Sequence, residues 1–97
     1  MGIFGGGMSH LSQDKTKLLA RVRRLRGQIE AVERAVEADR DCATILHLVA
    51  SVRGSVTGLT AELIDEHLIH HIRDEADPEA RIAGSDALAR ALRSYLK

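Results

Sequence analysis

The feature that most constrains the fold is an apolar stretch in the middle of the chain. Between residues 43 and 61 only Arg53 is charged. Apolar side chains recur there at alternating intervals of three and four residues, which is the period of a helix and not of a strand. A helix that is apolar over most of its circumference must be buried on more than one face. Because one partner helix covers only one face, the pattern predicts an oligomer. The recurring positions are Cys42, Ile45, Val49, Val52, Val56, Leu59 and Leu63.

Two further helices are expected on either side of this stretch. A stripe of the same spacing predicts a long amphipathic helix from residue 11 to about residue 39, with a break at 38–41. The central helix should continue to about residue 74, and Pro78 should open a short third helix that Gly84 interrupts. We therefore predict an all-α fold, an antiparallel hairpin of two long helices plus a short C-terminal helix. Residues 1–10 are expected to form a flexible arm, and residues 11–97 a single domain.

Length and composition exclude several classes of protein. A chain of 97 residues is enough for one small domain. No uninterrupted apolar run of about 18 residues is present, so no membrane span is expected. One cysteine and no secretory signal point to a reducing, cytoplasmic setting. No acid/base pair or activated nucleophile is evident, so the chain is not expected to be an enzyme.

Cysteine and histidine residues of the central helix form a candidate metal site. His67 and His71 are four residues apart and project from one face, which suits two imidazoles on one ion. Cys42 is roughly 37 Å away at ~1.5 Å per residue, so one chain cannot join all three. Two such helices packed antiparallel would place Cys42 of one chain beside the histidines of the other, giving two identical sites. Ordinary surface histidines and a buried, inert Cys42 are the alternatives.

A cationic ridge on the first helix is a candidate phosphate-binding surface. The whole chain carries 14 basic and 14 acidic residues, but residues 14–26 hold six basic residues and one acid. Lys17, Arg21 and Arg24 recur at i, i+4 and i+7 on one face, and Arg53 is the lone charge of the central stretch. Such rows bind phosphates, and their binding weakens with salt. A solvated face balanced by acids further along the helix is the alternative.

Several segments, in order, resemble the CsoR/RcnR/FrmR family of bacterial repressors. The resemblance implies a helical-hairpin protomer, assembled as a dimer of dimers, whose apo form binds operator DNA. An effector bound between subunits would release that DNA. The segments are RVRRLRGQI at 21–29, Cys42, VRGSVTGL at 52–59, ELIDEH at 62–67 and LRSYLK at 92–97.

The family's sensing positions match His10, Cys42, His67 and His71, a set similar to that of the nickel/cobalt-sensing branch. Three imidazoles and one thiolate suit Ni(II) or Co(II) better than Cu(I), and Zn(II) would also bind such a set.

The resemblance therefore implies a cytoplasmic Ni(II)/Co(II)-responsive repressor of a metal efflux gene. Double-stranded operator DNA would be contacted by Lys17, Arg21, Arg24 and Arg53. Two alternatives remain open. One is a repressor of the same fold in which Cys42 reacts with formaldehyde or another electrophile, and the other is a helical metal-buffering protein without a DNA role.

Overall fold

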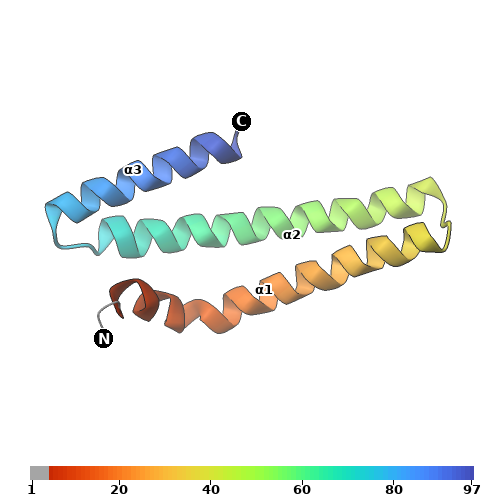
Figure 1. The fold of residues 1–97 in the computed structure, drawn as a ribbon, viewed down its shortest axis with the longest axis horizontal. Helices are drawn as coiled ribbons and strands as arrows, with labels where there is room; N and C mark the ends of the chain where they lie inside the picture. The colour runs from red at the N-terminus through yellow and green to blue at the C-terminus, as the bar shows by residue number, and fades with distance from the viewer. Residues whose placement is uncertain (1–4) are drawn as a thin grey trace. The chain divides into compact units, whose positions relative to one another are not determined.

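The computed structural model is all-α throughout the residues it describes, which are 5–97 for the backbone and 15–97 for the side chains. Its elements are α1 (Gly5–Glu37), α2 (Cys42–Leu68), the π-helical turn η1 (Ile69–Arg73) and α3 (Pro78–Tyr95) (Figure 1). The predicted fold class is confirmed. The start of α1 precedes the expected residue 11, because extending an existing helix is easier than nucleating one.

The break between the long helices is a helix-terminating turn followed by a helix cap. Asp39 has a φ of 54°, the left-handed conformation that ends many helices. The Arg40 amide donates to the Ala35 carbonyl at 2.9 Å, and the Asp39 amide donates to Val36 at 3.1 Å. These are the paired bonds of a Schellman motif, so the last carbonyls of α1 are satisfied.

The first turn of α2 is capped by Asp41. Its carboxylate accepts a hydrogen bond from the Thr44 hydroxyl at 2.7 Å and another from the Thr44 amide at 3.1 Å. An aspartate in this position satisfies amides that have no partner inside the helix. The two hydrogen bonds stabilise the charged form and lower the pKa of Asp41. The first-turn cap explains why α2 begins at Cys42.

The chain divides into two compact units, Met1–Thr60 and Ala61–Lys97. In the first, α2 returns alongside α1 as a hairpin (Figure 1). In the second, α3 packs against η1. Among residues 15–97, the buried apolar side chains are those of Leu18 and Ala35. Val22, Ile29 and Val36, which recur every seven residues along α1, are 44%, 52% and 55% exposed. In a single protomer, the apolar stripe of α1 thus remains largely exposed to solvent.

By length and composition alone, the segment Cys42–Arg73 is also long and apolar enough to cross a membrane. The core helix of a soluble protein meets the same criterion. Arg53 lies near the middle of the apolar part, where a charged side chain is costly in a bilayer. Its presence favours a helix that is covered by protein.

Candidate metal centre and nucleic-acid interface

His67 and His71 lie together in the second unit. Their ring centroids are 4.8 Å apart and their planes are inclined by 41°. Both side chains are half-buried. The α-helix gives way to η1 between them, where the Asp74 amide donates to the Ile69 carbonyl at 2.9 Å. Short π-helical turns often occur at functional sites. The sequence predicted that the two rings share a face, but its periodicity carried no sign of the π turn.

The ring of His67 is held by α3. Its Nε2 lies 2.8 Å from the backbone carbonyl oxygen of Gly84. Because a carbonyl only accepts, Nε2 carries the proton in this hydrogen bond, and in the neutral ring Nδ1 keeps its lone pair. A backbone carbonyl that fixes the tautomer and orientation of a histidine is a common partner of metal-ligating imidazoles. The arrangement leaves Nδ1 as the nitrogen that would ligate.

Gly84 also lies directly against His71. A Cβ at this position would overlap the His71 backbone carbonyl oxygen and come within 3.2 Å of the His71 Cβ. Only glycine therefore allows α3 to pack this closely. The expected interruption of the third helix at Gly84 was wrong, because α3 runs unbroken from Pro78, with Asp77 accepting from the Glu79 amide at 3.4 Å. The glycine serves the packing of α3 and does not end the helix.

The remaining polar groups near the pair are engaged with one another. His70 Nε2 lies 3.2 Å from the Glu66 carboxylate, one helical turn earlier, and both side chains are mostly buried. The Arg73 guanidinium donates to Asp74 at 2.9 and 3.1 Å, and this contact lowers the pKa of the Asp74 carboxyl. His70 thus contacts Glu66 on a neighbouring face and does not belong to the His67–His71 pair.

Cys42 and His10 complete the predicted ligand set. Cys42 is a free, exposed thiol at the start of α2 in the first unit. The side chain of His10 lies outside the described residues. Over the described part of the chain, no three histidine, cysteine or acidic residues gather around a point that could hold a metal. Of the predicted ligands, the described part of one protomer brings together His67 and His71.

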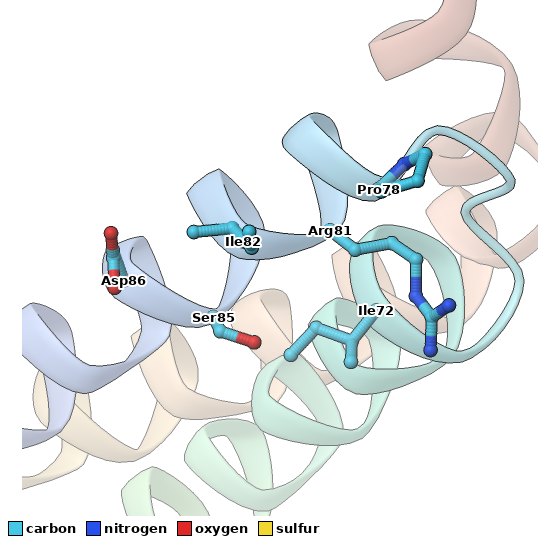
Figure 2. A pocket seen from close by; sticks show the side chains of 6 residues that line it. All are labelled: Ile72, Pro78, Arg81, Ile82, Ser85 and Asp86. Carbon is cyan, nitrogen blue, oxygen red and sulfur yellow. The ribbon is translucent and has the colours of Figure 1, made fainter.

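The second unit also has a hollow of about 390 Å³ between η1 and α3. Figure 2 shows Arg81 and Ser85 extending from α3 towards Ile72, while Asp86 points away. The lining mixes apolar, hydroxyl and oppositely charged groups, and it contains no histidine or cysteine. It is therefore separate in chemistry from the candidate metal centre.

The cationic ridge of α1 lies in the first unit, beside α2. Arg21 and Arg24 line a hollow of about 360 Å³, and with Lys17 they line a second one of about 240 Å³. The Arg21 guanidinium lies over Gly58, where an added Cβ would be 2.8 Å from Nη1. Arg53 is exposed on α2 but lines neither hollow. The structure thus brings together three of the four predicted DNA-contacting residues.

Sequence reasoning missed the polar residues that share the larger hollow. Gln28 continues the ridge of Arg21 and Arg24 at a helical interval, which was a signal that could have been followed. The contributions from α2 depend on the packing of the hairpin and had no local signal. They are Ser51, Gly54 and Ser55.

The chain is similar in sequence to a family of transcriptional repressors. Residues 14–94 match the family described as metal-sensitive transcriptional repressors. A protein encoded in the bioA 5' region of Serratia marcescens is 45% identical over 91 residues, 93% of this chain and 100% of that one. The transcriptional repressor RcnR of Salmonella typhimurium (strain LT2) is 38% identical over 90 residues, again 93% of this chain and 100% of that one.

A solved structure is similar as well. It is a glutamate-to-histidine variant of the formaldehyde-responsive regulator FrmR from Salmonella enterica serovar Typhimurium. The two chains are 42% identical, with a TM-score of 0.79 over 86% of this chain and 94% of that one.

Proposed function

The chain belongs to the family of metal-sensitive transcriptional repressors, and on that premise we propose that it binds operator DNA without metal and releases it when Ni(II) or Co(II) binds. The proposal places the protein in the cytoplasm and assigns a metal efflux gene as its target. The observation that carries the metal part is the His67–His71 pair, with its rings 4.8 Å apart and His67 oriented by Gly84.

The residues present fit a divalent first-row metal. His67 would ligate through Nδ1, with His71 beside it and with the thiolate of Cys42 from another subunit. His10 would supply a third imidazole. Nitrogen-rich sets with one thiolate suit Ni(II) and Co(II), whereas Cu(I) prefers more sulfur. Zn(II) would also accept these ligands. When bound, the metal supplies a charge that holds side chains of different subunits at one point.

The apolar surface that one protomer leaves exposed supports the assignment of Cys42 from another subunit. The exposed stripe of α1 and the apolar α2 require cover that one protomer does not give. Two-fold pairing would cover them and bring Cys42 of the partner subunit to the histidine pair, with two equivalent sites for each dimer. A dimer of dimers would present the cationic ridge in several copies to double-stranded DNA.

The contacts of α3 with the pair provide a route by which metal binding would release DNA. His67 bonds to Gly84 through its side chain, and His71 touches Gly84 through its backbone. Metal ligation that reorients either histidine would move α3 relative to the pair. The assembly would then favour a conformation that binds DNA poorly. A hundredfold loss of DNA affinity corresponds to a coupling free energy of about 3 kcal/mol.

The test is a DNA-binding titration of the metal-free protein with Ni(II), Co(II) and Zn(II). The probes are duplexes from the promoter region of its own gene and a random-sequence duplex. Ni(II) or Co(II) should release the promoter duplex, and Cys42→Ala, His67→Ala and His71→Ala should each abolish the release. His47→Ala is the matched control, because His47 is an exposed histidine of α2 outside the predicted set. Absence of any metal effect on DNA affinity would sink the proposal.

A second candidate function keeps the fold and changes the effector. Cys42 is a free, exposed thiol, and the similar solved structure is that of a formaldehyde-responsive regulator. In this case formaldehyde would release the DNA, Cys42→Ala would abolish the response and His71→Ala would leave it intact. The metal-buffering alternative loses its support, because the family consists of transcriptional repressors.

A further inference from the structure

α3 packs against η1 through one face and leaves most of the opposite face exposed. This outer face carries an aliphatic side chain at each end: Ile82 is 63% exposed, and Leu96, which caps the helix, is 74% exposed. The residues of the outer face recur at intervals of four and three, so they form one stripe along the helix. They are Ile82, Asp86, Ala89, Arg93 and Leu96. Two aliphatic side chains this exposed on one stripe indicate a contact surface.

Opposite charges lie on the outer face between its apolar ends. Asp86 and Arg93 are both exposed, and neither forms an ion pair within residues 15–97. They are separated along the helix by roughly 10 Å at ~1.5 Å per residue, which is too far for a direct contact between their backbones to bring the charges together. Each charge is therefore available to a partner outside the protomer.

The outer face is complementary to itself about Ala89. Ile82 and Leu96 are equally far from Ala89 in sequence, and Asp86 and Arg93 are nearly so. If two copies of α3 cross antiparallel at Ala89, Ile82 of each copy faces Leu96 of the other, and Asp86 faces Arg93. A two-fold interface requires this matching, because the same patch must serve both partners. The small side chain of Ala89 allows the two helix axes to approach to about 8 Å.

The hollow between η1 and α3 lies at the Ile82 end of the outer face (Figure 2). Its volume is about 390 Å³, and Ile72, Pro78 and Ile82 form the apolar part of its lining. In the antiparallel arrangement, the Leu96 side chain of the other copy reaches this end of the helix. An exposed aliphatic side chain would thereby leave water for an apolar surface, which is favourable.

We propose that the outer face of α3 forms a two-fold interface with the outer face of α3 in a second copy, centred on Ala89. The inference rests on the proposed function, in which dimers that share metal sites pair into a dimer of dimers. A closed assembly of this kind needs a second self-complementary surface besides the one that covers α1 and α2. The outer face of α3 supplies that surface and joins one dimer to the other.

Duplex DNA suits the outer face less well than a second copy does. Asp86 offsets the charge of Arg93, so the stripe has no net charge with which to attract phosphates. The two aliphatic ends also have no counterpart on a phosphate backbone. A second copy satisfies both features, because it presents one aliphatic group to each end and one opposite charge to each charge.

The first experiment places a single cysteine at the centre of the interface. Ala89→Cys is made in a Cys42→Ala chain, which has no other thiol. A residue on a two-fold axis faces its own copy, so the two new thiols would lie close enough to form a disulfide. Ser94→Cys in the same chain is the matched control, because Ser94 is exposed on α3 but lies outside the outer face.

Mild oxidation of the metal-free protein, followed by denaturing electrophoresis, reads out the cross-link. Ala89→Cys should give covalent dimers, and Ser94→Cys should remain monomeric on the gel. Equal cross-linking of the two variants, or none in either, overturns the inference.

The second experiment exchanges the two charges. Asp86→Arg or Arg93→Asp alone would place like charges opposite each other twice in the interface, and each should halve the assembly mass measured by light scattering. Both changes together restore opposite charges and should restore the mass. Arg93→Gln removes an attraction without adding a repulsion and should keep the mass. Arg34→Asp is the control for net charge, since Arg34 is exposed on α1, and it should also keep the mass.

Circular dichroism reports the fold of each charge variant, and the cross-linking result holds even where a reversed charge unfolds the chain. Single reversals that keep the full mass, or a double exchange that fails to restore it, overturn the inference. All these measurements are made without metal or DNA. An unaltered chain with the mass of a dimer therefore overturns the inference alone, whereas an intact α3 interface without any metal effect on DNA binding overturns the proposed function alone.

Discussion

The imidazole of His67 donates a hydrogen bond from Nε2 to the backbone carbonyl of Gly84, across 2.8 Å. The same glycine lies against the backbone of His71. One residue of α3 therefore contacts both members of the candidate metal pair. Its carbonyl binds His67, and its lack of a side chain lets it pack against His71. These contacts link the orientation of the two rings to the position of α3.

Gly84→Ala should destabilise the protein, because the added methyl group would overlap the His71 carbonyl oxygen. Overpacking of this kind typically costs about 1–3 kcal/mol. Urea unfolding followed by circular dichroism measures the change. Gly27→Ala provides the comparison, since its methyl group meets nothing within 4 Å and replaces glycine in a helix. It should leave stability unchanged or raise it by up to about 1 kcal/mol. Equal effects at the two positions would show that Gly84 is not a packing constraint.

Mixing two inactive variants should restore metal binding. Cys42→Ala lacks the thiolate, and the double variant His67→Ala with His71→Ala lacks both imidazoles. After unfolding and joint refolding, a mixed antiparallel dimer would contain one complete site and one empty site. Random pairing then restores about a quarter of all sites.

The Co(II)–thiolate absorption band in the near ultraviolet is the readout for this mixture. The band should be absent from each variant alone and present in the mixture. If the unaltered protein shows the band and the mixture does not, a site shared between subunits is ruled out.

Arg24→Gln should weaken DNA binding at all sequences and flatten its salt dependence. Arg24 is exposed on α1 and lines both hollows of the ridge. Loss of one phosphate contact reduces the salt slope by about 1. Arg93→Gln removes the same charge from an exposed position on α3 and should leave the slope as it was. If both variants reduce the slope equally, net charge and not the ridge governs binding.

The thermal midpoint should rise with protein concentration. Leu18 and Ala35 are the buried apolar residues among those described, so assembly must supply most of the covered surface. When folding and association are coupled, mass action makes the midpoint concentration-dependent. Ile29→Glu places a charge in the exposed stripe of α1, where Ile29 is 52% exposed in the protomer. This variant should lose both assembly mass by light scattering and helicity by circular dichroism. A folded, monomeric Ile29→Glu protein would contradict the expectation.

Acid should weaken the start of α2. The Thr44 hydroxyl and amide hold the pKa of Asp41 below its ordinary value of 3.8. A carboxyl whose pKa is lowered by folding stabilises the folded state above that ordinary value, and the contribution disappears as pH falls through the lower, folded value.

Thr44→Val removes the hydroxyl donor and should raise the pKa of Asp41, as measured by NMR titration of its carboxyl carbon. Thr57→Val serves as the control, because the Thr57 hydroxyl donates to the Arg53 carbonyl within α2. An unchanged pKa in Thr44→Val would show that the hydroxyl is not the cause.

Local patterns were enough to predict the helices and the break between them. The apolar stripes of both long helices follow the helical period, and Pro78 marks the start of α3. The helical interval between His67 and His71 also placed both rings on one face, which the structure confirms. These features depend on residues a few positions apart, so the sequence itself carries them.

Only tertiary packing shows what surrounds Gly58 and Gly84. The sequence marked Gly84 as an interruption, but its neighbour is the His71 backbone, which the turn after η1 brings back to α3. Gly58 lies beneath Arg21, which belongs to the other arm of the hairpin. The proton on Nε2 of His67 is set by the carbonyl of Gly84, 17 residues away. Close approach between backbones depends on which distant segments meet, and periodicity within one helix does not record that.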